Sequence, residues 1–189
     1  MEIINKLIEN IKTKFKDINF ILKIDNREKK IIELLNEIPD FVKFDNLDLV
    51  LGDGFNFKGE YDVFVSNLPY SQSRRFIHWA SGEKFRASII TVQQEFFDKI
   101  NSDIKSKTYR AITVLAKTAF NIIPLEIIPN TSFYPSPKVQ SRILLLTRKR
   151  IINPEMKNLL IKLFTYKGKT IQSTLNSLNI NAELSEKQK

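Results

Sequence analysis

The stretch Asn67-Leu68-Pro69-Tyr70 decides how the rest of this chain is organised. It closely follows Val63-Phe64-Val65, an apolar run typical of a buried parallel strand. Because Pro69 donates no backbone hydrogen bond and disfavours helix at the residue before it, we expect the strand to end here. The carboxyl ends of such strands are where open α/β sheets bind ligands. The turn combines the amide of Asn67, the carbonyl of Leu68, the rigid ring of Pro69 and the aromatic face of Tyr70, a set that suits a planar base with an exocyclic amine. The alternative is a strand-ending turn with a packed Tyr70.

The composition bounds the class of protein. With 189 residues, of which 42% are hydrophobic, the chain is long enough for one domain with a sizeable core, or for one domain and a fragment of a second. It contains no cysteine, which excludes disulfides, thiolate catalysis and cysteine zinc sites. His78 is the single histidine, which argues against a histidine-based triad or a multi-histidine metal site. The first residues are charged where an export signal needs an apolar core. No apolar run approaches the roughly 18–20 residues of a membrane span. We therefore expect a cytoplasmic protein with no membrane and no metal partner.

The charge of the chain favours a polyanionic partner. Its net charge is +9 and its sequence pI is ≈ 9.6. Basic proteins gain binding free energy by releasing counterions from nucleic acid. The alternative is a lysine-rich, solvated surface, as in many small proteins of thermophiles or of AT-rich genomes.

Apolar periodicity and turn residues predict the order of helices and strands. Helices are expected over 3–15, from Asp25 or Asn26 to 38, over 71–80, 94–100 and 109–120, and after the cap Asn153-Pro154. Extended segments are expected at 19–24, 49–51, 62–66, 88–92, 122–128 and 142–147. Strands that alternate with helices indicate a three-layer α/β fold around a parallel, doubly wound sheet. We assign residues 1–150 to this domain and residues 151–189 to the beginning of a small helical domain.

Several motifs occur in the order and at the spacing of one enzyme family. They are Leu51-Gly52-Asp53, Asn67-Leu68-Pro69-Tyr70, Gln93-Gln94-Glu95-Phe96, Tyr109 before a helix, Phe133-Tyr134-Pro135-Ser136-Pro137-Lys138-Val139, and the stretch from Phe164 to Leu175 with its basic centre. Over nearly its whole length the chain resembles the rRNA adenine N6,N6-dimethyltransferases, the KsgA and Erm group of S-adenosylmethionine enzymes. An Asn-Pro-Pro-Tyr motif alone would indicate only an amino-group methyltransferase. The combination of Asn67-Leu68-Pro69-Tyr70 with the proline-rich loop from Phe133 to Val139 indicates this family. The resemblance implies a Rossmann-like class I methyltransferase sheet.

The chain departs from the family at several places. No glycine precedes Gly52, although the family carries a Gly-rich loop upstream of the first helix expected here. Lys23 stands where the family has the acid that binds the cofactor's ribose, and Asp25 matches a second, less functional acid. Ser73-Arg74-Arg75 replaces Ser-Ser-Pro-like residues, and the C-terminal helical domain stops short. These departures predict an N-terminally truncated sheet without its central strand, in either a mis-started chain or a reduced relative.

The chemistry of the target explains the motif. The amine of adenine is a poor nucleophile because its lone pair is conjugated with the ring, so catalysis rests on orientation and electrostatics. By resemblance, the Asn67 side-chain oxygen and the Leu68 carbonyl accept its two N–H bonds, while Pro69 fixes the direction of that carbonyl. Tyr70 stacks on a base flipped out of the RNA, and Phe133 covers the other face of that base.

The resemblance also implies the binding residues. Asp53 and Asn67, with Asp25 as a weaker candidate, would contact the cofactor S-adenosylmethionine; the alternative for Asp53 is a loop residue that caps Gly54. Since Lys23 offers no acceptor and no Gly-rich loop is present, we expect this chain to bind the cofactor weakly or not at all. The basic C-terminal half predicts contacts with RNA phosphates, with a solvated face as the alternative. The candidate RNA-binding residues are Arg142, Arg148, Lys149, Arg150, Lys167 and Lys169.

Two functions from different classes follow. The first is S-adenosylmethionine-dependent N6-dimethylation of adjacent adenosines near the 3′ end of small-subunit rRNA, by a monomer that meets the pre-ribosomal small subunit during ribosome biogenesis. The second is a non-catalytic rRNA-binding assembly factor derived from this family. A third and weaker hypothesis is a methyltransferase that acts on adenine in another nucleic acid.

Overall fold

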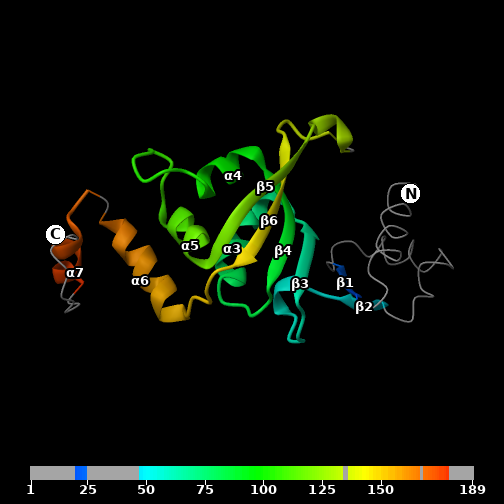
Figure 1. The fold of residues 1–189 in the computed structure, drawn as a ribbon, viewed down its shortest axis with the longest axis horizontal. Helices are drawn as coiled ribbons and strands as arrows, with labels where there is room; N and C mark the ends of the chain where they lie inside the picture. The colour runs from blue at the N-terminus through cyan, green and yellow to red at the C-terminus, as the bar shows by residue number, and fades with distance from the viewer. Residues whose placement is uncertain (1–19, 25–46, 134–135, 167, 179–189) are drawn as a thin grey trace. The chain divides into compact units, whose positions relative to one another are not determined.

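The computed structural model describes residues 20–24, 47–133, 136–166 and 168–178. The chain divides into two compact units, Met1–Gly59 and Glu60–Lys189. Helices and strands are labelled as in Figure 1.

The described part of the first unit contains a pair of parallel strands. β1 (Phe20–Ile24) pairs with β2 (Leu47–Leu51), which confirms the extended segments predicted at 19–24 and 49–51. β2 ends just before Gly52, whose φ of 146° lies where residues with a Cβ are disfavoured. The helices predicted over 3–15 and up to residue 38 lie outside the described residues.

The second unit contains a four-stranded sheet in the order β3-β4-β6-β5. The strands are β3 (Val63–Asn67), β4 (Ala87–Gln93), β5 (Phe120–Ile128) and β6 (Ser141–Arg148). β3 and β4 are parallel, whereas β6 runs antiparallel to both of its neighbours. The predicted α/β class is confirmed, but the prediction of an all-parallel sheet is wrong for β6, which runs opposite to the other three strands.

The connection between β5 and β6 explains their antiparallel pairing. Parallel neighbours need a crossover, usually a helix, whereas the described residues of 129–140 contain only the short 3-10 helix η4 (Asn130–Ser132). The chain therefore turns back at the same edge of the sheet, and β6 inserts between β4 and β5. Pro124, which donates no hydrogen bond, is accommodated because β5 is an edge strand with an irregularity between Pro124 and Ile127.

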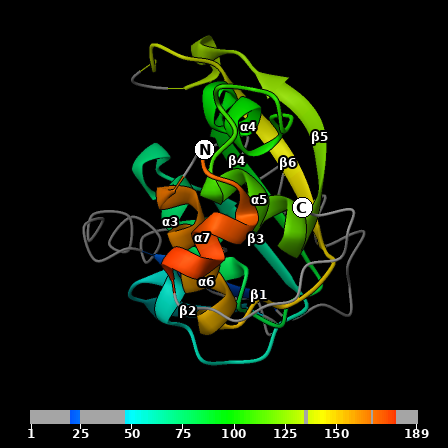
Figure 2. The ribbon, with the colours of Figure 1, turned by 90° about the vertical axis from the view of Figure 1, so that its left-hand side faces the viewer.

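Three helices cover one face of this sheet (Figures 1 and 2). They are α3 (Ser73–Ala80), α4 (Gln94–Ile100) and α5 (Ala111–Ala119). Alternate residues of β4 are buried on this side, because successive side chains of a strand point to opposite faces. The buried apolar residues of this core include Phe76, Ile77, Ile90, Val92, Ile112, Leu115, Leu144 and Leu146.

The opposite face of the sheet carries exposed apolar side chains. Val63 and Val65 of β3 are 51% and 69% exposed, and Ile89 of β4 is 37% exposed. Within the described residues, this unit is therefore a sheet covered by helices on one face. The third layer of the predicted fold involves the helices that lie outside the described ranges, and it stays a prediction.

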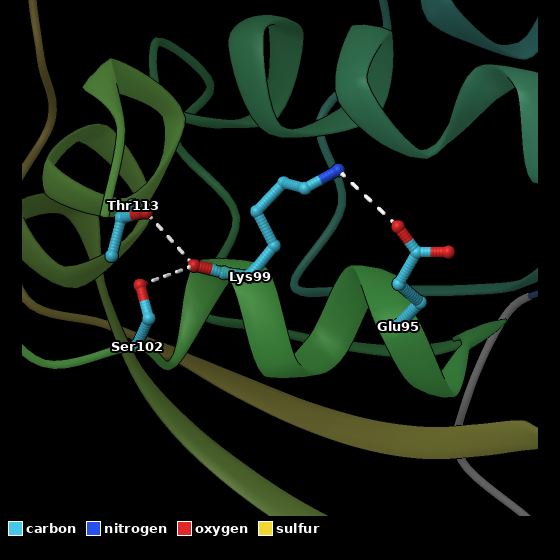
Figure 3. A network of polar contacts seen from close by, with 4 residues as sticks. All are labelled: Glu95, Lys99, Ser102 and Thr113. Carbon is cyan, nitrogen blue, oxygen red and sulfur yellow. Dashed lines mark hydrogen bonds and ion pairs between the residues drawn. The ribbon is translucent and has the colours of Figure 1, made fainter. Parts of the chain in front are cut away.

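One backbone carbonyl holds the turn between α4 and α5 (Figure 3). The carbonyl of Lys99 accepts hydrogen bonds from Ser102 Oγ at 2.9 Å and from Thr113 Oγ1 at 2.8 Å. Lys99 Nζ lies 3.9 Å from Glu95 Oε1, one turn earlier in α4. Glu95 lies in the first turn of α4, as predicted, where its negative charge is favourable. These contacts fix α4, which directly follows the end of β4.

Two further helices follow β6. Asn153 Oδ1 accepts a hydrogen bond from Met156 N at 2.8 Å and Pro154 opens α6 (Pro154–Thr165), which confirms the predicted cap. α6 contacts α5, and α7 (Ile171–Ser177) contacts α6 (Figure 2). The predicted domain boundary between residues 150 and 151 lies within the second compact unit. A separate helical domain beginning there stays a prediction.

Candidate active site at the carboxyl edge of the sheet

Four segments meet at one edge of the four-stranded sheet, which we call the carboxyl edge. The register sets Asn67 of β3 opposite Thr91 of β4, and Gln93 of β4 opposite Ser141 of β6. Ser141 also pairs with Ile128, the last residue of β5. The ends of β3, β4 and β5 and the beginning of β6 therefore lie along the same edge.

The Asn67-Leu68-Pro69-Tyr70 turn leaves β3 at this edge. Asn67 is exposed, whereas Leu68 is 5% exposed and anchors the turn in the core. Pro69 has φ −53° and ψ 133°, and its carbonyl accepts a hydrogen bond from Gln72 N at 2.8 Å, across the short helix η3 (Tyr70–Gln72). The turn thus exposes the polar side chain of Asn67 to solvent, while the buried Leu68 and the ring of Pro69 hold its backbone in place.

A contact that sequence reasoning missed fixes the Tyr70 hydroxyl group. Tyr70 Oη lies 2.6 Å from Ser141 Oγ, at hydrogen-bond distance, and Ser141 is fully buried. The two residues are 71 positions apart, so no local sequence pattern pairs them. The bond ties the turn after β3 to the strand that follows the proline-rich loop. We therefore identify Ser141 as a positioning residue for the Tyr70 ring.

Phe133 approaches the same edge from the loop between β5 and β6. It directly follows η4, its backbone N–H donates to Asn130 O at 3.3 Å, and the residue is half-buried. The fold thus brings the loop that carries Phe133 to the edge at which Asn67 and Tyr70 lie. A base held between Tyr70 and Phe133 is compatible with this arrangement and stays a prediction.

A polar network links α4 to β6 at the carboxyl edge. Arg142 Nε donates to Gln94 Oε1 at 2.8 Å, and Gln94 Nε2 donates to Asp98 Oδ1 at 2.8 Å. The Arg142 guanidinium also lies 5.1 Å from the centre of the Phe97 ring, within cation–π range. Arg142, predicted to contact RNA, is therefore held beside the candidate site by internal contacts while it remains partly exposed.

Arg148 lies at the opposite edge of the sheet, where its contacts are internal. Its Nη2 donates to Ala80 O at 2.9 Å and its Nε donates to Phe85 O at 3.3 Å. The guanidinium lies 4.6 Å from the Phe85 ring centre and 4.4 Å from that of Phe120. Burial lowers the pKa of Arg148, and the nearby Glu83 carboxylate partly offsets this effect. These contacts favour a structural role over the phosphate contact that the sequence predicted.

The other predicted RNA-binding residues are spread over the second unit. Lys149 and Arg150 follow Arg148 at the opposite edge and are exposed, and Lys169 is exposed just before α7. Lys167 lies outside the described residues. Among the described members of the set, Arg142 alone belongs to the carboxyl edge, and RNA contact by all of them stays a prediction.

Two cations bind carbonyl groups of the last turn of α3. Lys157 Nζ, from α6, donates to His78 O at 2.7 Å, and Arg148 donates to Ala80 O. Positive charge is favourable at the C-terminal end of a helix, where carbonyls lack intrahelical partners. Burial, the Arg74 guanidinium and the Lys157 ammonium lower the pKa of His78, in that order of size. The pKa of His78 is therefore lowered by one cation at each end of α3, Arg74 and Lys157.

Two described residues of the first unit bear on cofactor binding. Asp53 caps the short helix η2 (Gly54–Asn56), and its Oδ1 accepts a hydrogen bond from Phe55 N at 2.9 Å. Capping is the alternative role that the sequence allowed, and contact between Asp53 and S-adenosylmethionine stays a prediction. Lys23 lies on β1, and a lysine cannot accept bonds from ribose hydroxyls. Asp25 lies outside the described residues.

The described ranges carry neither a cluster of metal ligands nor a membrane-spanning helix. No group of three or more His, Cys, Asp or Glu side chains in these ranges could hold a metal ion. In the same part of the chain, no helix is long and apolar enough to cross a membrane.

Sequence comparison identifies relatives of this chain. A family model described as ribosomal RNA adenine dimethylase matches residues 5–189. A relative from Borreliella burgdorferi, ribosomal RNA small subunit methyltransferase A, is 36% identical over 166 residues, which make up 83% of this chain and 58% of that protein. The chain thus spans little more than half the length of this relative.

Solved structures share the fold. A dimethyladenosine transferase from Plasmodium falciparum matches with a TM-score of 0.72 at 21% identity, over 90% of this chain and 72% of that one. The 23S rRNA methyltransferase ErmE matches with a TM-score of 0.56 at 22% identity, over 84% of this chain and 66% of that one. At these identities the likeness shows the fold alone, and it confirms the predicted Rossmann-like class I methyltransferase sheet.

Proposed function

This chain belongs to the ribosomal RNA adenine dimethylase family, and we propose that its carboxyl edge methylates N6 of adenosine in small-subunit rRNA. The proposal includes S-adenosylmethionine as methyl donor, two adjacent adenosines near the 3′ end of the RNA as substrate, and action in the cytoplasm, as a monomer, during ribosome biogenesis. The observation that carries it is the hydrogen bond between Tyr70 and Ser141, which fixes an aromatic ring three positions after the exposed Asn67.

The Asn67 turn offers the acceptors that this chemistry needs. S-adenosylmethionine supplies an electrophilic methyl group when it is bound. The Asn67 side-chain oxygen and the Leu68 carbonyl accept the two N–H bonds of the adenine amine, which directs its lone pair at the methyl carbon. The buried Leu68 side chain and the Pro69 ring hold these acceptors in place before the substrate arrives. Because the Asn67 side-chain amide is neutral and takes up no proton during methyl transfer, it needs no deprotonation before a second methyl group is transferred.

Tyr70 and Phe133 provide the stacking that selects a flipped base. A base that leaves its stack loses contacts, and stacking on an aromatic side chain returns roughly 1–3 kcal/mol per base. The Tyr70 ring loses little further freedom on binding, because Ser141 already holds its hydroxyl group. The site therefore suits an unpaired adenosine.

Asp53 and Asn67 are the proposed contacts of the cofactor, with Asp25 as a third. Asp53 would accept a bond from the adenine amine of the cofactor. Lys23 cannot replace the acid that binds ribose in the family, so we propose that this chain binds S-adenosylmethionine weakly. An activity assay must therefore use cofactor concentrations that calorimetry shows to be saturating.

Methylation of rRNA by the 189-residue chain tests the proposal. The chain is incubated with saturating S-adenosylmethionine and small-subunit rRNA that lacks methylated adenosines, and the nucleosides are analysed by mass spectrometry. We expect N6-methyladenosine and N6,N6-dimethyladenosine. RNA binding without either product would overturn the proposal in favour of the non-catalytic assembly factor. Product in an adenine-containing DNA but not in rRNA would favour the third hypothesis.

A further inference from the structure

Arg74 and Arg75 stand in the first turn of α3, at the carboxyl edge. Both are exposed, and α3 begins three residues after Tyr70. The buried residues of this helix are Ser73, Phe76, Ile77 and Ala80. Arg74 is separated from Tyr70 by about 6–8 Å along the chain, at a rise of roughly 1.5–2.0 Å for each of four residues. The backbone of both arginines is thus close to that of Tyr70, and their side chains are exposed on the outer side of α3.

The position of these arginines is electrostatically unfavourable for the helix. The N-terminal end of a helix carries partial positive charge, so cations there reduce its stability. The first turn of α3 contains no acidic residue that would offset them, and neither does the rest of the helix. Arg75 Nη1 also donates a hydrogen bond to Gln72 Oε1 at 3.4 Å. An anionic ligand would offset the positive charge of the two arginines at this end of the helix.

The positive potential extends along the outer side of α3. Arg74 precedes His78 by one helical turn, and after burial it is the largest cause of the lowered pKa of His78, followed by Lys157. The His78 imidazole therefore reports the electrostatic potential between the carboxyl edge and α6.

We propose that Arg74 and Arg75 bind the phosphodiester groups that flank the target adenosine. The inference rests on the proposed function, because it takes the base to be held by Asn67 and Tyr70. When a nucleotide is flipped, its base enters the site while its backbone stays outside, so its two phosphates lie near the rim of the site. Arginine suits these groups because its planar fork of donors matches phosphate oxygens.

The salt dependence of RNA binding tests this proposal. The probe is a short single-stranded RNA that contains an adenosine pair, and no cofactor is present. The test variant is Arg74→Ala with Arg75→Ala, and the matched control is Lys84→Ala with Arg86→Ala. Lys84 and Arg86 are exposed and precede β4, at the edge opposite the candidate site. Each double variant removes two positive charges, so the net charge of the two proteins is the same.

We expect the slope of log K against log salt concentration to become shallower by about 1.4 in the test variant, since each phosphate contact with a single strand contributes about 0.7. The control should keep the slope of the wild type. An equal change in both variants would show a general effect of charge and overturn the proposal. An unchanged slope in the test variant would overturn it as well.

The single histidine gives a second, independent readout. In an NMR pH titration, the RNA probe should raise the pKa of His78 in the wild type, because a phosphate at Arg74 offsets the charge that lowers it. The Arg74→Ala, Arg75→Ala variant should show no such rise on adding RNA. A wild-type pKa that RNA leaves unchanged would contradict phosphate binding at Arg74. Because neither measurement involves methyl transfer, a failure of the proposed function is told apart from a failure of this inference.

Discussion

The two ends of α3 use the same kind of side chain in opposite ways. At the C-terminal end, Arg148 and Lys157 donate hydrogen bonds to carbonyls of the last turn, where positive charge is favourable. At the N-terminal end, Arg74 and Arg75 are exposed where positive charge is unfavourable. The comparison teaches that the position of a cation on the helix and the groups around it decide whether its charge stabilises the fold. Net charge alone does not make this distinction.

The largest effect on stability is expected at the C-terminal end. Arg148→Leu removes a charged donor from the carbonyls of Ala80 and Phe85 and a cation from two aromatic rings. We expect the free energy of unfolding in denaturant to fall by about 2–4 kcal/mol. The matched change Arg74→Leu, at an exposed position, should alter it by about 0.5 kcal/mol or less. Equal losses in the two variants would contradict the division between the two ends of α3.

A smaller effect is expected at the bond that positions Tyr70. Tyr70→Phe keeps the ring and removes the bond to Ser141, so unfolding should cost about 0.5–1.5 kcal/mol less. Methyl transfer at saturating cofactor should slow about 10-fold, because the ring is less well positioned. Ser141→Ala should behave in the same way, and the double variant should lose little more than either single variant. Fully additive losses would show that the two hydroxyl groups do not act together.

The smallest expected effect on stability is the pH dependence due to His78, whose pKa responds to cations at both ends of α3. Its pKa in the folded chain lies below its ordinary value of about 6.5, because of burial, Arg74 and Lys157. The unfolded chain therefore binds a proton more readily, and the stability present above about pH 6.5 is lost as pH falls through the folded pKa. Arg74→Ala raises the folded pKa, so denaturant unfolding should show a smaller loss in acid. His78→Asn provides the reference without this titration. The same acid dependence in Arg74→Ala and wild type would argue against the contact.

Local patterns predicted the elements better than the contacts between them. β3 and β4 were predicted to within one residue at each end and α4 to the residue, because side-chain alternation and helix caps are local properties. The cap at Asn153 and the end of β3 at the Asn67 turn were likewise predicted from a few neighbouring residues. These features place the candidate site at the edge of a sheet.

Strand direction and long-range partners were harder to predict. The antiparallel pairing of β5 and β6 was missed, although the proline-rich loop between them lacks the helical period that a parallel crossover needs. The bond from Tyr70 to Ser141 spans 71 positions and the bond from Arg148 to Ala80 spans 68, so neither leaves a local signal. A count of basic residues treats Arg148 and Arg74 alike, because burial and carbonyl partners become visible only in the folded chain.

Asn67 carries the chemistry proposed for the carboxyl edge, and its removal is the decisive measurement. Asn67→Ala and wild type are compared in single-turnover methyl transfer to unmethylated small-subunit rRNA at saturating S-adenosylmethionine. The loss of one preorganised hydrogen-bonding group predicts a rate about 10²–10³-fold lower. RNA affinity should fall by no more than one hydrogen bond is worth, about 0.5–1.5 kcal/mol, because Asn67 is uncharged and contacts no phosphate in this proposal. Equal rates of methyl transfer in the two proteins would contradict the assignment of Asn67 as the acceptor that orients the adenine amine.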